Sequence, residues 1–68
     1  MLGSLMQQAD KLTAGDLVLV GDVRAPTPVR VVAVKVVGPG FLKLELEGGG
    51  MLMLGAKIML PALKEEEL

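Results

Sequence analysis

The sequence contains no cysteine and no histidine. Without cysteine the chain can form neither a disulfide bond nor a thiolate metal site. Without histidine it also lacks the commonest metal ligand and the usual general base. Its hydroxyl groups, Ser4, Thr13 and Thr27, therefore have no histidine, cysteine or tyrosine to activate them. We expect no catalytic residue, no metal and no cofactor, so the chain is predicted not to be an enzyme.

Aromatic residues and asparagine are also nearly or wholly missing. Phe41 is the only aromatic residue, so the core must be built from leucine, valine and methionine. The absence of asparagine is a trend of heat-adapted proteins, which the five methionines oppose. Residues 1–10 lack the basic start and long apolar run of a signal peptide, and no stretch approaches the ~18 apolar residues of a membrane span. A cytoplasmic protein is the expectation.

What the chain does have is a large apolar share in a small size. About half of its 68 residues are hydrophobic, and its formal net charge is −1. A domain of this size buries only about 60% of the surface that its unfolded chain exposes. Small domains are usually stabilised by disulfides, a metal or oligomerisation, and only oligomerisation remains open here. The weak net charge argues against a nucleic acid as the default partner.

The N-terminal segment has the spacing of a short helix. Leu2, Leu5, Met6, Ala9 and Leu12 recur at offsets of three and four, which places them on one helical face. The alternative is that residues 8–12 form an extended lead-in to the first strand. Residues 1–12 are therefore assigned to an N-terminal helix or extension.

From residue 13 the pattern is that of short strands. Strands are expected at 17–20, 29–37, 41–47, 51–54 and 57–60, separated by glycine-rich and proline-rich turns, with Pro61 ending the last strand. The connections are too short for parallel crossovers, so all pairs should be antiparallel. The prediction is a single mainly β domain over residues 1–68. It consists of a small five-stranded antiparallel barrel over 13–61 and an acidic tail over 62–68.

One phrase of the sequence supports this architecture. The run from Leu12 through Gly15, Asp16 and Val18 resembles the "L-x-x-G-D-x-V" opening of many SH3-like small barrels. The resemblance extends over about residues 12–61 and implies an SH3-like fold. SH3-like barrels that bind proline-rich peptides carry an aromatic groove, which this chain lacks, so no peptide-binding residues are carried over.

The strand residues sort into two faces. One consistent aliphatic set is the expected core, and it consists of Leu42, Leu44, Leu46, Leu52, Leu54, Ile58, Leu60, Val32, Val34 and Val36. The opposite face should be polar, but it carries many apolar residues among its lysines and glutamates. Two explanations remain open. The N-terminal helix or bent strands cover this face within the chain, or another chain covers it.

The second explanation leads to the functional prediction. The predicted protein interface comprises Phe41, Met51, Met53, Met59, Val29 and Val31. Flexible methionine side chains suit such surfaces. We therefore expect a non-catalytic interaction or assembly module. Its partner would be a second copy of the chain, giving a homo-oligomer, or an unknown protein.

The alternative function is nucleic-acid binding by a small barrel. Its contacts would be Arg24, Arg30, Lys35 and Lys43, with the two lysines facing each other across a hairpin. A single phenylalanine offers almost no stacking platform, and glutamates dilute the basic residues, so this reading is the weaker one. Asp16 and Asp22 each follow a glycine, which indicates turn chemistry and not catalysis.

Overall fold

The computed structural model describes residues 6–22 and 24–64. Within these ranges the chain forms strands and one short 3-10 helix, with no α-helix. In chain order the elements are β1 (Met6–Gln8), η2 (Ala9–Lys11), β2 (Leu17–Val20), β3 (Thr27–Gly38), β4 (Phe41–Leu46), β5 (Met51–Gly55) and β6 (Met59–Leu63). The described residues include no helix long and apolar enough to cross a bilayer.

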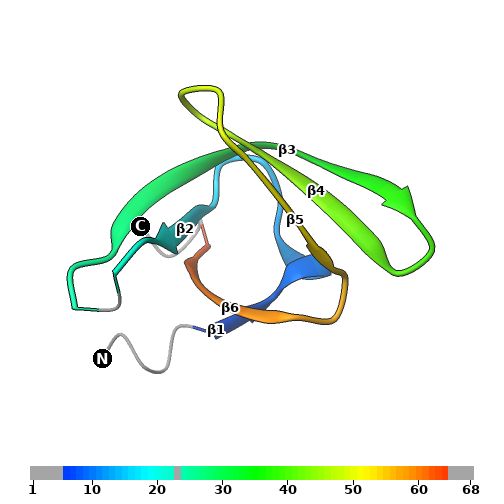
Figure 1. Ribbon diagram of the computed structural model, residues 1–68, viewed down its shortest axis with the longest axis horizontal. Helices are drawn as coiled ribbons and strands as arrows, with labels where there is room; N and C mark the ends of the chain where they lie inside the picture. Colours follow the sequence, from blue (N-terminus) through cyan, green and yellow to red (C-terminus); the bar gives the residue numbers. More distant parts are fainter. Residues whose placement is uncertain (1–5, 23, 65–68) are drawn as a thin grey trace.

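The strands form one sheet in the order β1-β6-β2-β3-β4-β5, and every pair is antiparallel. The sheet curls around the core, with β3, β4 and β5 on one side and β6 and β1 on the other (Figure 1). The antiparallel, mainly β prediction is therefore confirmed. The prediction of a five-stranded closed barrel is wrong, because β1 adds a sixth strand and the edge strands β1 and β5 are not paired with each other.

The N-terminal segment differs from the expected helix. Met6–Gln8 is extended and pairs with β6, and only Ala9–Lys11 forms a single 3-10 turn. A five-residue apolar stripe in so short a segment is a weak helical signal, and pairing with a neighbouring strand outweighs it. Leu2 and Leu5 of the predicted stripe lie outside the described residues.

The last strand also departs from its prediction. β6 covers Met59–Leu63 and so contains Pro61, which was expected to end it. The Ala9 N–H donates to the Ile58 carbonyl, so these two residues are a hydrogen-bonded pair. Because such pairs alternate along the β1–β6 register, the backbone groups of Pro61 point away from β1 and toward β2. The β2–β6 ladder runs only from Leu17↔Leu63 to Val18↔Ala62. Pro61 therefore ends the β2–β6 ladder but not the strand β6 itself.

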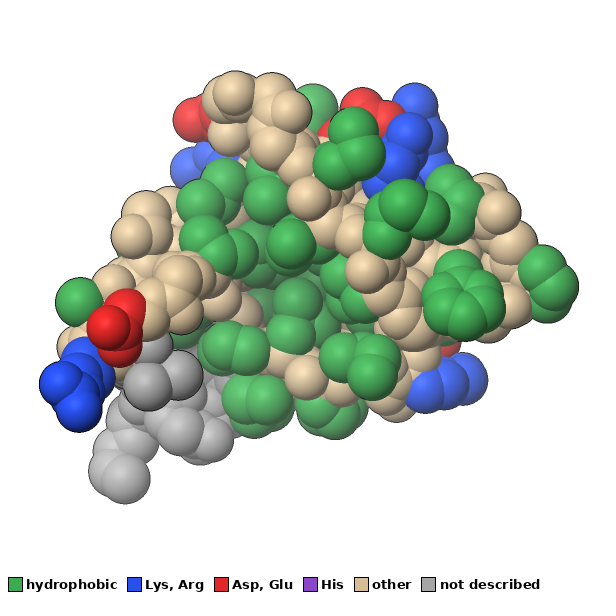
Figure 2. All heavy atoms as spheres, viewed as in Figure 1, with side chains coloured by type: hydrophobic (Ala, Val, Ile, Leu, Met, Phe, Trp, Pro, Cys, Tyr) green, Lys and Arg blue, Asp and Glu red, His purple; other side chains and the backbone are tan. Residues whose placement is uncertain are grey.

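The core is aliphatic, as expected from the composition. Its buried cluster contains Leu12, Val18, Val31, Leu44, Leu46 and Ala62, and partly buried Val20, Val29, Val34, Leu52, Leu54 and Leu60 pack against it. Figure 2 shows hydrophobic side chains gathered in the hollowed middle of this view, between the two sides of the curled sheet. The core is thus only partly covered by the residues that the structure describes.

A bulge in β3 corrects the predicted faces of this strand. The register with β4 shifts between Val31 and Ala33, so Val31 and Val34 both point inward although they are three residues apart. Val32, predicted for the core, therefore points outward and is 54% exposed. Val36, also predicted for the core, lies opposite Leu42 on the same face as Val34, but it is near the end of the strand and is 78% exposed. Ile58, also predicted for the core, lies in the turn before β6 and is 52% exposed.

The corner between η2 and β2 is held by one buried carboxylate. Gly15, with φ 103°, lets the chain turn between Thr13 and Asp16. Asp16 Oδ2 accepts hydrogen bonds from the Thr13 N–H at 2.8 Å and from Lys64 Nζ at 2.7 Å. Lys64 Nζ also donates to the Lys11 carbonyl at 2.7 Å. This corner, defined by residues 11–16 and Lys64, ties the end of β6 to the start of β2.

Candidate interaction surface

The strands β4 and β5 place one set of side chains toward the core and the other toward the outside. Their register pairs Phe41 with Gly55, Lys43 with Met53 and Glu45 with Met51. Directly opposite residues of an antiparallel pair lie on the same face. The β4–β5 outer face therefore consists of Phe41, Lys43, Glu45, Met51 and Met53.

The apolar side chains of this face are uncovered. Phe41 is 59%, Met51 57% and Met53 67% exposed. None of the described residues provides the internal cover that was one of the two explanations for this face. Three large apolar side chains on one strand pair form the kind of surface that a partner commonly covers.

A small ion cluster borders the apolar residues. Lys35 of β3 lies opposite Lys43 of β4, as the sequence predicted, and both approach Glu45. Glu45 Oε2 lies 2.8 Å from Lys35 Nζ and 3.8 Å from Lys43 Nζ. The hydrogen bond from Lys35 and the charge of this lysine hold the pKa of Glu45 below its ordinary value of 4.5. The cluster gives the face a polar rim.

The edge of β5 is the second open feature of the hairpin. Leu46 N–H donates to the Gly50 carbonyl and Ala56 N–H to the Gly40 carbonyl, which fixes the alternation along the β4–β5 ladder. By this alternation Leu52 and Leu54 direct their backbone groups toward β4. Met51, Met53 and Gly55 direct theirs away from β4, toward the free edge. The Gly55 carbonyl accepts a bond from the Ile58 N–H at 3.2 Å.

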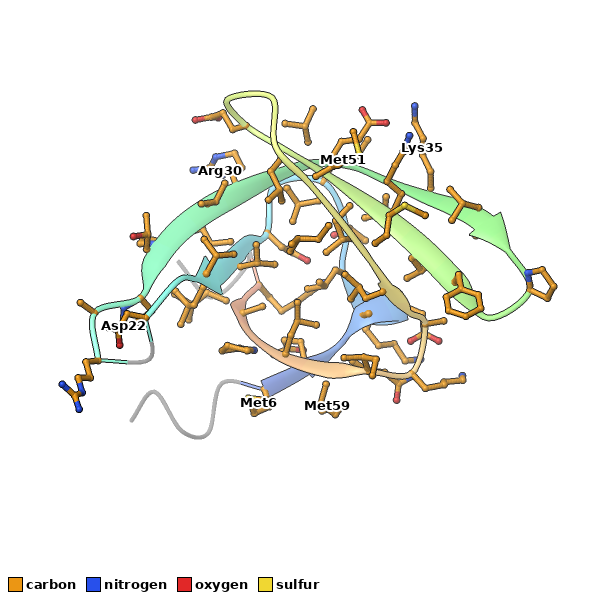
Figure 3. The ribbon with its side chains drawn as sticks, in the orientation of Figure 1. Met6, Asp22, Arg30, Lys35, Met51 and Met59 are labelled. Carbon is orange, nitrogen blue, oxygen red and sulfur yellow. The ribbon has the colours of Figure 1, made fainter. Side chains whose placement is uncertain are left out.

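The other residues of the predicted interface lie elsewhere. Met59 is exposed on β6 beside Met6 of β1, on the opposite side of the molecule from Met51 (Figure 3). Val31 is buried in the core, and Val29 packs against it. The structure thus brings Phe41, Met51 and Met53 together and separates Met59, Val29 and Val31 from them.

The four basic residues of the nucleic-acid alternative do not form one surface. Arg30 and Lys35 lie well apart along β3 (Figure 3). Arg30 donates to the Gly15 carbonyl at 2.9 Å and lies 4.0 Å from Glu47, while Lys35 and Lys43 share Glu45. Arg24 is exposed in the loop before β3. Phosphate binding depends on clustered basic groups, which these positions do not supply.

The two aspartates singled out in the sequence serve turns, as predicted. Asp22 accepts a hydrogen bond from the Arg24 N–H at 2.8 Å. Asp16 accepts one from the Thr13 N–H, but its bond with Lys64 was not anticipated, because Lys64 was assigned to an acidic tail. Only the course of β6 beside β2 brings these two residues together. Within residues 6–22 and 24–64, no group of acidic side chains is arranged to hold a metal ion.

Comparisons with protein-family models, with curated proteins and with solved structures found no match to this chain. The functional assignment therefore rests on the surface and its geometry.

Proposed function

We propose that this domain is a non-catalytic assembly module that associates with a second copy of itself through the β4–β5 outer face. The observation that carries the proposal is the exposure of Phe41, Met51 and Met53 on one strand pair beside an open sheet edge. Covering such side chains removes apolar surface from water, which is the main favourable term in most protein association.

The size of the core supports the same conclusion. Six of the residues that pack against the buried cluster are themselves only partly buried. A chain without disulfides gains stability by mass action when a second copy binds its folded form. Self-association would thus supply part of the stabilisation that the small core lacks.

The first experiment is light scattering coupled to size-exclusion chromatography, over a concentration series from ~1 µM to ~1 mM and at two salt concentrations. The wild-type mass should rise from monomer to dimer with concentration. Salt should change the transition little, because the contact is mainly apolar. In Met53→Lys a charge must be desolvated at the centre of the face, so association should weaken at least ~10-fold.

Met59→Lys is the matched control, because it makes the same change at an exposed methionine on the opposite side of the molecule. It should associate like the wild type. A wild-type protein that stays monomeric over the whole series would contradict the proposal. So would a Met59→Lys variant that loses association while Met53→Lys keeps it.

A further inference from the structure

We infer that the two copies pack their β4–β5 outer faces together about a two-fold axis that sets Lys43 of each copy against Glu45 of the other. This inference rests on the proposed function and names the charge pairing that selects an identical partner. The axis is parallel to the sheet, crosses the strands and passes between the Lys43–Met53 row and the Glu45–Met51 row.

Two charged side chains lie within the contact that the methionines define. On β4, Lys43 is directly opposite Met53 of β5, and Glu45 is directly opposite Met51. A partner that covers the two methionines therefore also meets this lysine and this glutamate, whose side chains are 28% and 33% exposed. Charges that lose water in a contact need an opposite charge beside them. The partner must therefore offer both a carboxylate and a cation.

The outer face of β4 is complementary to itself in charge. Lys43 and Glu45 are two residues apart on one strand, so their side chains point the same way. When a second copy lies antiparallel across the face, the order of its two charges is reversed. Each lysine then meets a glutamate, and the two-fold axis forms both pairs at once. Such pairs fix the register more than the affinity, so the weak salt dependence of an apolar contact remains.

The contacts within one chain leave Lys43 able to take this role. Lys35 Nζ lies 2.8 Å from Glu45 Oε2, whereas Lys43 Nζ lies 3.8 Å from the same atom, beyond hydrogen-bond distance. Lys35 thus holds Glu45, and Lys43 can turn toward a second carboxylate without breaking that bond. In the pair of copies, each Glu45 would lie between its own Lys35 and Lys43 of the other copy.

The same charges argue against the neighbouring arrangements. An axis through the Lys43–Met53 row would set lysine against lysine, and one through the Glu45–Met51 row would set glutamate against glutamate. An axis along the strands would set each row against its own counterpart, so Lys43 would meet no carboxylate. The axis between the rows pairs opposite charges and sets Met53 of each copy on Met51 of the other.

This arrangement also places the Phe41 side chain. Phe41 precedes Lys43 by two residues, so it would face the position two residues after Glu45 in the second copy, at the start of the turn over residues 47–50. An added Cβ at Gly48 or Gly49 of this turn would meet no heavy atom within 4 Å. The turn therefore leaves room for the ring.

Charge reversal tests the pairing. Lys43→Glu would set carboxylates against carboxylates, and Glu45→Lys would set lysines against lysines. Each variant alone should associate at least ~10-fold more weakly than the wild type, because like charges that face each other disfavour binding. An equal mixture of the two should form a heterodimer within ~3-fold of the wild-type affinity, since opposite charges face each other again. Light scattering over the same concentration series measures all three.

The double variant Lys43→Glu/Glu45→Lys separates charge pairing from net charge, because its net charge equals that of the wild type. Its new carboxylate lies opposite Lys35, so the fold should remain by circular dichroism. It should self-associate within ~3-fold of the wild type. Arg24→Glu is the matched control for Lys43→Glu, because it changes the net charge equally in the exposed loop before β3. It should associate like the wild type.

The outcomes separate this inference from the proposed function. Recovery of association in the mixture and in the double variant supports the pairing of Lys43 with Glu45. A wild-type dimer overturns this pairing, but not self-association, if the single variants associate normally or if the mixture and the double variant show no recovery. An equal loss in Arg24→Glu and Lys43→Glu has the same meaning. A wild type that is monomeric by light scattering overturns both.

Discussion

The corner of residues 11–16 with Lys64 and the β4–β5 hairpin differ in where their polar groups lie. They are buried and hydrogen-bonded in the corner, and they lie at the surface in the hairpin. In the corner, the carboxylate of Asp16 is 1% exposed and meets donors from the backbone and from Lys64. In the hairpin, one face is buried through Leu44, while the other presents methionines, and the backbone groups of Met51 and Met53 point to the edge of the sheet. The first arrangement stabilises the domain, whereas the second leaves large apolar side chains exposed to water.

The largest effect should come from the inner face of the hairpin. Leu44→Ala removes a fully buried side chain from the centre of the core cluster and should lower the free energy of unfolding by about 3–5 kcal/mol. Met53→Ala on the outer face should change it by at most about 0.5 kcal/mol when the protein is dilute enough to be monomeric. Urea unfolding followed by far-ultraviolet circular dichroism measures both, since the chain has no tryptophan or tyrosine. Equal losses would show that the two faces do not differ as described.

A smaller effect is expected from the corner. Lys64→Met removes the ammonium group from a carboxylate that stays buried, and should lower the free energy of unfolding by about 2–4 kcal/mol. Lys57→Met is the control, because Lys57 lies 3.1 Å from Asp10 in a far more exposed ion pair. It should change the urea midpoint much less. If both variants lose the same stability, burial of the Asp16–Lys64 pair has no special role.

The smallest effect should come from the ion cluster on the outer face. The pKa of Glu45 is held below 4.5 by Lys35, so its contribution to stability is present above pH 4.5 and is lost as the pH falls through the lower, folded-state pKa. Lys35→Met should therefore lower the thermal midpoint slightly near neutral pH and not at strongly acidic pH. Lys43→Met, which removes the more distant lysine, should have a weaker effect. A Lys35 effect that is independent of pH would be inconsistent with this role.

Much of the fold could be predicted from patterns that extend over a whole element. The alternation from Phe41 to Leu46 correctly assigned both faces of β4, because each side chain there has one clear environment. In β3 the same reasoning failed. A β-branched run has no polar residue to mark the bulge at Val32, so Val29 and Val31 were placed outside and Val32 inside.

The remaining errors concern contacts between segments far apart in the chain. Met6–Gln8 is a strand because β6 lies beside it, which its own spacing cannot reveal. Lys64 meets Asp16 only because β6 returns along β2. For a related reason, only half of the residues predicted for the interface lie together in the structure. Phe41, Met51 and Met53 belong to one local hairpin, whereas Met59 was grouped with them by strand alternation although its strand lies on the other side.

The position of β6 between β1 and β2 also has a consequence for the order in which the domain folds. β3, β4 and β5 are joined by short turns, so their pairing closes only small loops of chain. β6 must find β1 and β2, and Leu17 pairs with Leu63 across most of the described sequence. Closing a longer loop costs more chain entropy, and contacts of this kind slow folding. The hairpin that carries the methionines can therefore take shape early, while the Asp16–Lys64 ion pair forms only when the last strand arrives.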